Sequence, residues 1–258
     1  PNEAVNLVDR ALQLQPENPE IHNNLAIMFN GLSKFDKAIE HFNRALELHP
    51  SDPVTLNNKG NALRATNALP AAQDCFQRAI TLAPDYAQAH SNLGITLIEL
   101  EQPEAAKAAL KIALNLTPKD PAVWSNLSAA LQDLGEFNDA LASANKALTL
   151  DANHASAINN RGNVLMKLNH FMEAEVEFRR AIQIQPNYAD AYINLGLTQQ
   201  MQNHPIDAIE TLKQGLQIDY NNPNLHWNLA LALLQTGNFE AGWREYEWRW
   251  RMPKFSVF

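Results

Sequence analysis

The sequence repeats itself every 34 residues, and this period constrains the fold more than any other feature. Its most regular mark is an asparagine that recurs in seven consecutive segments: Asn24, Asn58, Asn92, Asn126, Asn160, Asn194 and Asn228. An uninterrupted repeat of this length is typical of an array in which each unit packs mainly on its neighbours. We therefore expect one elongated array, although 258 residues would suffice for one or two globular domains.

Each repeat predicts two helices, which we call helix A and helix B. We number positions from the first residue of each unit, so that the units are 19–52, 53–86, 87–120, 121–154, 155–188, 189–222 and 223–256. Positions 4, 7, 8 and 11 have the spacing of an apolar helix face, and positions 20, 24, 27 and 28 have it again. Asparagine or glycine at position 15 marks a turn between the helices, and proline at position 32 ends helix B in four units.

Small residues at positions 8, 20 and 27, together with large ones at position 24, carry a resemblance to a known family. The pattern resembles the tetratricopeptide repeat family across all seven units. This resemblance implies an all-α fold, a right-handed α-solenoid of antiparallel helix pairs, with helix A on the concave surface. Residues 1–18 fit helix B of a further, truncated unit, with Val8, Ala11 and Leu12 on its packing face. We expect this end to fray or to pair with a second copy, and residues 257–258 to lead into an absent domain.

The asparagine at position 6 is expected on the face of helix A that lies opposite its apolar stripe. At 100° per residue, the apolar positions centre near 30° and position 6 lies near 240°. Asparagine costs about 0.5 kcal/mol relative to alanine in a helix, so its recurrence needs a reason. Inheritance by duplication is one alternative, but position 2 has drifted freely between units. A hydrogen bond from the amide to an adjacent repeat is another.

The third alternative is a peptide-binding ladder. An amide offers two donors and an acceptor, which match the backbone groups of an extended polypeptide whatever its side chains. A ladder of this kind is similar to the repeat domain of O-linked N-acetylglucosamine transferase. We therefore expect a protein-interaction module that binds an extended polypeptide, as the substrate-recruiting part of a bacterial glycosyltransferase of that type. The alternative is a non-catalytic scaffold for a multiprotein complex.

Two units depart from the pattern together. They place Lys59 and Arg161 at position 7, where leucine is expected, and add Asn61 and Asn163 at position 9. The long cationic side chains either extend over the edge of the core or anchor an acidic ligand. We include all four residues among the candidate peptide-binding residues.

The last unit ends in an aromatic-rich helix. Trp243, Tyr246 and Trp250 follow the spacing of one helix face, whereas Trp248 lies outside it. These four residues either cap the array or dock a following domain. Similar endings occur in bacterial tetratricopeptide proteins that continue into glycosyltransferase-like domains.

Composition excludes several other classes of function. A net charge of −8 argues against nucleic-acid binding, and no apolar run approaches the roughly 20 residues of a membrane span. The single cysteine, Cys75, suits a reducing, cytoplasmic setting. His22, His90 and His226 recur at position 4 as core-edge residues without metal-ligand spacing. We expect no catalytic constellation, no metal and no cofactor in these residues.

Overall fold

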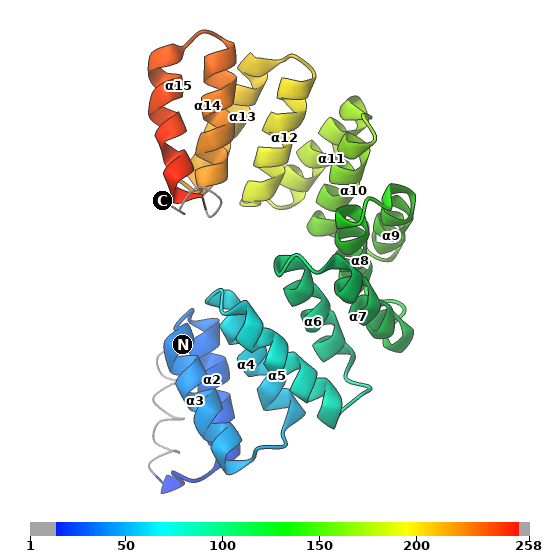
Figure 1. Cartoon of the computed structure of the whole chain (residues 1–258), viewed down its shortest axis with the longest axis vertical. Coiled ribbons are helices and arrows are strands. Elements are labelled where there is room, and N and C mark those ends of the chain that lie inside the picture. The colour runs from blue at the N-terminus through cyan, green and yellow to red at the C-terminus, as the bar shows by residue number, and fades with distance from the viewer. Residues whose placement is uncertain (1–13, 253–258) are drawn as a thin grey trace. The chain divides into compact units, whose positions relative to one another are not determined.

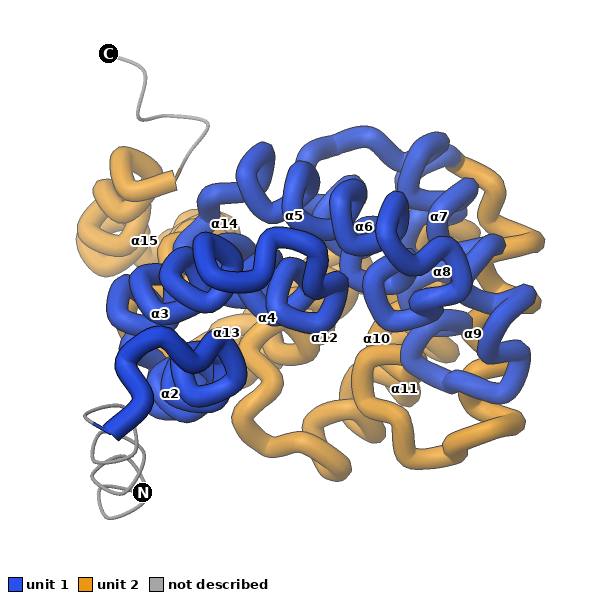
Figure 2. Tube along the Cα trace, turned by 90° about the horizontal axis from the view of Figure 1, so that it is seen from below, with its two compact units in different colours: residues 1–134 blue, residues 135–258 orange. Residues whose placement is uncertain are grey.

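The computed structural model describes residues 14–252, and within that range every regular element is helical. The chain divides into two compact units, residues 1–134 and residues 135–258 (Figure 2). The expected truncated helix over 1–18 lies outside the described residues up to residue 13, and so does the expected tail at 257–258. Nothing in the described part therefore bears on fraying or pairing at the N-terminal end.

The all-α expectation is confirmed, because each repeat forms two helices, and the repeats that lie within one compact unit form antiparallel helix pairs (Figure 1). The helices of the first unit are α2 (Pro19–Gly31), α3 (Phe35–Leu48), α4 (Pro53–Ala65), α5 (Leu69–Leu82), α6 (Ala87–Glu99), α7 (Pro103–Leu116) and α8 (Pro121–Asp133). The helices of the second are α9 (Phe137–Leu150), α10 (Ala155–Lys167), α11 (Phe171–Ile184), α12 (Ala189–Met201), α13 (Pro205–Ile218), α14 (Pro223–Gln235), α15 (Phe239–Tyr246) and η1 (Glu247–Arg251). From α2 to α14, even-numbered helices are A helices and odd-numbered ones are B helices.

The turn from helix A to helix B has one geometry in all seven repeats. Position 15 adopts a positive φ in each of them, at Ser33, Asn67, Glu101, Gly135, Asn169, Asn203 and Gly237. Asparagine and glycine tolerate this left-handed conformation, which explains their recurrence at the position. Ser33 and Glu101 adopt it without that advantage, at φ of 57° in both cases. The shared turn geometry therefore follows from the packing of the helix pair as well as from the turn residue.

Helix A begins with a cap that the sequence encodes at position 34 of the preceding unit. Where proline opens the helix, the preceding residue is Asn18, Asp52, Asp120 or Asn222, and its side chain accepts a hydrogen bond from a first-turn N–H. Proline loses no bond at this position, because its N–H would have had no partner within the helix. The cap and the proline together fix the start of each of these helices.

Small residues at position 8 allow helix A to pack closely on position 24 of helix B. A Cβ placed on Gly60 would lie 2.6 Å from Phe76 Cε1, and one on Gly94 would lie 2.5 Å from Leu110 Cγ. Both large partners are fully buried. The expected close approach between positions 8 and 24 is therefore present, and glycine is the residue that the spacing accommodates.

The buried face of helix A is wider than the expected stripe at positions 4, 7, 8 and 11. Position 3 and position 10 are also buried, as at Ala89 and Thr96 of α6 or Ala191 and Thr198 of α12. Each A helix contacts the next A helix within its unit, as well as the neighbouring B helices. This packing between A helices buries positions 3 and 10. The expected stripe omits them because it considers only the contact of helix A with helix B of the same repeat.

The final helix differs from the expected aromatic stripe. The α-helix α15 ends at Tyr246, and the chain continues as the 3-10 helix η1. Trp250 therefore does not lie one α-helical turn beyond Tyr246, so the expected i, i+3, i+7 face of Trp243, Tyr246 and Trp250 is wrong in its last member. Arg249 occupies position 27, where small residues let helix B approach in the other units, and the α-helix stops before it.

Candidate functional site on the A helices

Positions 2, 6, 9 and 13 of the A helices form the face that is least covered by protein, and we call it the open face. Positions 2 and 13 are exposed in every unit, as at Gln88 and Glu99 of α6. Position 6 carries the asparagine. Successive A helices contact one another within each compact unit, so their open faces adjoin there.

The asparagines are more covered than an outer helix face would be. Only Asn24 is exposed, whereas the other six are half-buried. On the helical wheel, position 6 is adjacent to positions 3 and 10, which the neighbouring A helices bury. The expected place of these side chains, opposite the apolar stripe, stays a prediction: six of them are half-buried, and none is fully buried.

Two asparagines bind the preceding repeat through a position that the sequence analysis did not single out. Asn92 Nδ2 donates to Asn57 Oδ1 at 2.9 Å, and Asn194 Nδ2 donates to Asn159 Oδ1 at 3.0 Å. Asn57 and Asn159 occupy position 5 and are almost completely buried. Both belong to the two departing units. The adjacent asparagines at positions 5 and 6 of these units were the feature of the sequence that could have indicated this contact. At Asn92 and Asn194, these bonds have the geometry of the inter-repeat alternative.

The amides of Asn58, Asn126 and Asn228 have other environments. Asn228 Nδ2 donates to the carbonyl of Asn224 on its own helix at 2.8 Å. No hydrogen bond from the side chain of Asn58 or Asn126 is found within residues 14–252. These two amides are half-buried and keep their donors and acceptor for other partners.

Apolar side chains accompany the asparagines on the open face. Position 9 carries Ile27, Ile95, Leu197 and Leu231 in four units, and each of these is half-buried or exposed. The same position carries Asn61 and Asn163 in the two departing units, and both are half-buried. Asn163 Oδ1 has no hydrogen-bond partner among the described residues. The open face therefore combines amides with partly exposed apolar groups.

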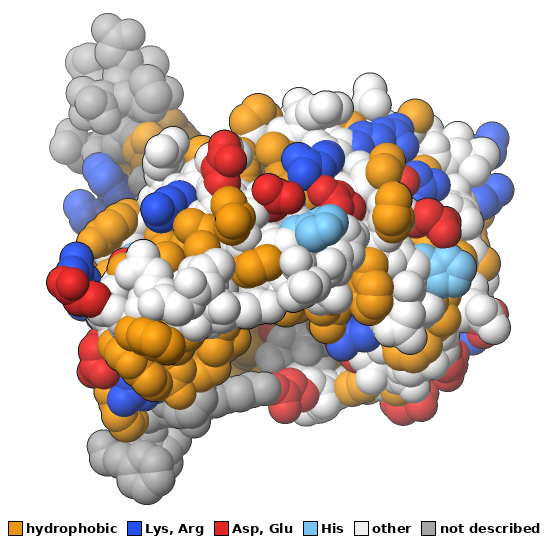
Figure 3. Space-filling model, turned by 90° about the horizontal axis from the view of Figure 1, so that it is seen from above, with side chains coloured by type: hydrophobic (Ala, Val, Ile, Leu, Met, Phe, Trp, Pro, Cys, Tyr) orange, Lys and Arg blue, Asp and Glu red, His pale blue; other side chains and the backbone are white. Residues whose placement is uncertain are grey.

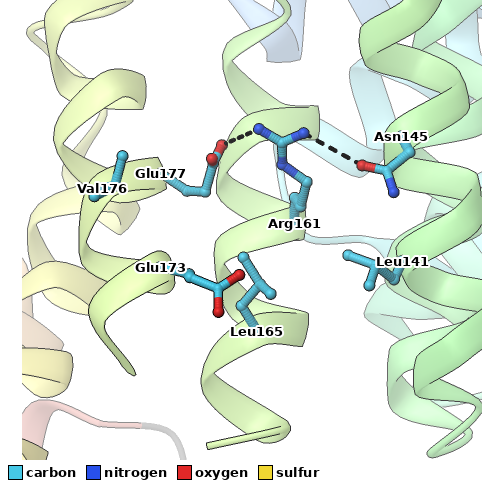
Figure 4. Close-up of a pocket in the computed structure, with 7 residues that line it drawn as sticks. All are labelled: Leu141, Asn145, Arg161, Leu165, Glu173, Val176 and Glu177. Carbon is cyan, nitrogen blue, oxygen red and sulfur yellow. Dashed lines mark hydrogen bonds and ion pairs between the residues drawn. The ribbon is translucent and has the colours of Figure 1, made fainter. Parts of the chain in front are cut away.

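Arg161 lies between the B helices α9 and α11, where its guanidinium reaches Asn145 on one side and Glu177 on the other (Figure 4). Its Nη2 lies 2.7 Å from Glu177 Oε2, and its Nη1 donates to Asn145 Oδ1 at 3.2 Å. With Leu141 and Leu165, these side chains line a pocket of about 410 Å³. The guanidinium is thus held by a carboxylate of the chain itself.

Lys59 occupies the equivalent place in α4. Its side chain is half-buried, and its positive charge lowers the pKa of the Cys75 thiol. Cys75 occupies position 23, the position that Glu177 occupies in the repeat of Arg161. Burial raises the pKa of the Cys75 thiol, and Lys59 opposes this effect. Lys59 and Arg161 therefore lie on the helix-B side of their A helices, and their assignment to a peptide ligand stays a prediction.

The position-4 histidines are buried residues, not edge residues. The Nε2 atoms of His22, His90 and His226 lie 2.7–3.0 Å from the backbone carbonyl six residues earlier. Trp124 and Tyr192 donate to the carbonyl at the same offset. In five of the seven units, position 4 thus supplies a side-chain bond that fixes the start of helix A to the preceding turn, whereas the other two units carry Leu56 and Ile158 there. Histidine, tryptophan and tyrosine can all donate a hydrogen bond from the side chain, and this common property could have indicated the contact from the sequence.

The C-terminal aromatic residues divide into packed and exposed members. Trp248 stacks on the buried His226, with ring centroids 3.7 Å apart and planes 6° apart, and Tyr246 contacts Trp227. Trp243 and Trp250 are 56% and 51% exposed. Trp248 was the residue expected outside the helix stripe, yet it covers the last repeat. Docking of a following domain by these residues stays a prediction, for which the exposed Trp243 and Trp250 offer the most surface.

Charged side chains of both signs occur together on the surface, with no large region of one sign on the face that Figure 3 shows. On the face shown in Figure 3, acidic and basic side chains alternate with apolar ones. Burial raises the pKa of the Glu99 carboxyl on the open face of α6, and the nearby Arg64 partly offsets this. Within residues 14–252, no cluster of three or more potential metal ligands occurs, and no helix is both long and apolar enough to cross a bilayer.

Solved structures of several repeat proteins are similar to this chain in fold. YrrB, a TPR protein, is 24% identical with a TM-score of 0.56, and the match covers 71% of this chain and 95% of that one. The Cut9–Hcn1 assembly of the APC/C matches at 18% identity and a TM-score of 0.79, over 99% of this chain and 50% of that one. A tetratricopeptide repeat protein from Parabacteroides merdae matches at 15% identity and a TM-score of 0.78, over 89% and 91% of the two chains. A comparison with curated proteins gives no match.

Family models match the repeats directly. Models described as "Tetratricopeptide repeat" match residues 19–52 and 92–157, and one described as "TPR repeat" matches residues 60–101, 162–203 and 207–237. Together they cover most of the array, in agreement with the 34-residue period, the helix pairs and the close contact between positions 8 and 24. The chain belongs to the tetratricopeptide repeat family.

Proposed function

We propose that this chain is a protein-interaction module that binds an extended polypeptide along the open face of its A helices. The observation that carries the proposal is the set of half-buried asparagines at position 6 on adjoining helices. Asn58 and Asn126 have no side-chain partner in the described part of the chain, so their amides are free to bind peptide backbone groups. Partly exposed apolar residues at position 9 add contact area for the ligand's side chains.

Asparagine suits this role because its amide pairs with both backbone groups of a peptide. The N–H donor satisfies a ligand carbonyl, and the oxygen accepts a ligand N–H. A half-buried amide is preorganised, since its neighbours restrict its rotamers before the ligand arrives. The similarity to YrrB, which is described as having an unusual peptide-binding site, adds support at the level of the fold.

We further propose that the bound polypeptide is a substrate recruited for a glycosyltransferase of the O-linked N-acetylglucosamine transferase type. This finer proposal depends on the resemblance of the asparagine series alone. A scaffold for a protein complex is the second candidate, supported by the similarity to the APC/C assembly Cut9–Hcn1. A scaffold has no need of free amides on its A helices, so the two candidates differ in their dependence on Asn58 and Asn126.

The test begins with peptides selected from a random library displayed on phage. The double variant Asn58→Ala/Asn126→Ala should bind a selected peptide about tenfold or more weakly, because each lost hydrogen bond contributes about 0.5–1.5 kcal/mol. The matched control is Asn43→Ala/Asn115→Ala, which removes two exposed asparagines from the B helices α3 and α7. Equal affinity of both double variants would refute peptide binding by the asparagines and favour the scaffold.

A further inference from the structure

A second pocket lies in the second compact unit, on the side of the B helices. It has a volume of about 310 Å³ and is lined by residues of α11, α12 and α13. Its residues from helix A are Leu195 and Gln199, at positions 7 and 11, so it is separate from the open face. Exposed carboxylates of α13, from Asp207 and Glu210, also line it.

Gln199 is an unusual residue for this buried position, because it lacks a hydrogen-bond partner that a ligand would supply. Position 11 carries phenylalanine or leucine in the other six repeats. Gln199 is only 1% exposed, and its Oε1 has no hydrogen-bond partner among the described residues. Burying an unpaired amide costs about 1–3 kcal/mol. No partner of its Nε2 is found in residues 14–252 either, so a half-turn of the amide presents either end to the pocket.

The preceding groove shows what this geometry accepts. There, between α9 and α11, the guanidinium of Arg161 reaches from position 7 to an amide oxygen of Asn145 and a carboxylate of Glu177. In the groove between α11 and α13, position 7 is Leu195, which brings no charge. The later groove thus has no cation at position 7, the place from which Arg161 acts in its neighbour.

Charge in the later groove favours a cation from outside. Arg179 lines the pocket, but its guanidinium is bound to Glu175 of the same helix at 2.7 Å. Asp207 and Glu210 therefore leave the rim with an excess of negative charge. Apolar atoms of Ile182 and Leu195 are available to contact an alkyl chain that crosses the rim.

We propose that this pocket binds the guanidinium of an arginine side chain carried by a partner polypeptide. Gln199 Oε1 is the buried acceptor, and Asp207 and Glu210 balance the charge at the rim. Guanidinium suits the pocket because its planar set of donors bonds an amide oxygen and carboxylates at once. The site is independent of the peptide bound on the open face.

The test is an NMR titration of the labelled chain with N-acetyl-arginine amide. We expect saturable shifts of the Gln199 side-chain amide and the Leu195 methyl groups. The isosteric but neutral N-acetyl-citrulline amide should produce none. The variant Gln199→Leu restores the residue type of the other repeats, so it should fold at least as well and weaken binding by about tenfold or more. Glu173→Gln, on the rim of the neighbouring groove, is the matched control and should leave binding unchanged.

Several results would overturn the proposal. Absence of shifts with the arginine derivative, or equal shifts with the citrulline derivative, excludes recognition of a guanidinium. Unchanged affinity in Gln199→Leu excludes the buried amide as the acceptor and leaves a water-filled pocket.

A second test needs no added ligand, because a substitution places the guanidinium on the chain itself. Leu195→Arg supplies a guanidinium from position 7, as Arg161 does in the preceding groove. It should lower the melting temperature less than Leu93→Arg, whose groove presents Ala105, Ala108 and Ala109 where carboxylates or hydroxyls stand in the later one. Equal losses in the two variants would contradict a cation-accepting groove.

Discussion

Replacing Asn92 by alanine should destabilise the array, although alanine is the better helix former. The substitution removes the donor of the 2.9 Å bond to Asn57 Oδ1, and Asn57 is 0% exposed. Leaving that oxygen buried and unpaired costs about 1–3 kcal/mol. The higher helix propensity of alanine stabilises the folded state by about 0.5 kcal/mol. The net expectation is a loss of about 0.5–2.5 kcal/mol, the difference of these two effects.

Asn58→Ala is the matched comparison, because its asparagine occupies the same repeat position without a bond to the preceding repeat. It should leave stability unchanged or raise it by up to about 0.5 kcal/mol. Urea unfolding followed by circular dichroism measures both variants. Because repeat arrays often unfold in stages, hydrogen exchange of α4 and α6 should accompany it.

A double-mutant cycle isolates the pair. The variant Asn57→Ala/Asn92→Ala should be more stable than the sum of the single effects implies, with a coupling of about 0.5–3 kcal/mol. If Asn92→Ala is as stable as Asn58→Ala, the bond between repeats contributes nothing, and position 6 has no structural role at Asn92.

Three further predictions concern packing and titration. Gly94→Ala should lower the melting temperature, because overpacking against Leu110 costs about 1–3 kcal/mol and exceeds the gain of about 1 kcal/mol in helix propensity. Cys75 should react slowly with iodoacetamide until urea unfolds the chain; because its folded pKa is raised, stability should fall as the pH rises past the ordinary thiol pKa. Trp248→Ala should cost about 1–2 kcal/mol in urea unfolding through the lost stack, whereas Trp250→Ala, at an exposed site, should cost less than about 0.5 kcal/mol.

The sequence predicted the helix pairs well because their signals are local. Small residues at position 8 and turn residues at position 15 identify the close contact and the left-handed turn directly. Ser33 and Glu101 show the limit of this reading, since their positive φ follows from the packing of the pair and not from their own preference.

The environment of the asparagines was harder to predict, because it depends on contacts between repeats. A single helical wheel places position 6 opposite the core, but it omits the neighbouring A helices that half-bury six of the seven side chains. The same omission hid the role of Asn57 and Asn159, which look like solvent-facing residues until the next repeat packs on them. The direction of Arg161 depends likewise on Glu177, sixteen residues later on another helix.

The most direct test of the central claim is a scan of a selected peptide by backbone N-methylation, measured by isothermal calorimetry. N-methylation removes one peptide N–H at a time and leaves the side chains in place. If the asparagine amides bind the peptide backbone, methylation at recurring positions should weaken binding about tenfold, and the Asn58→Ala/Asn126→Ala variant should lose part of that sensitivity. A peptide that tolerates methylation throughout, yet loses binding when its side chains are changed, would contradict backbone recognition by the asparagines.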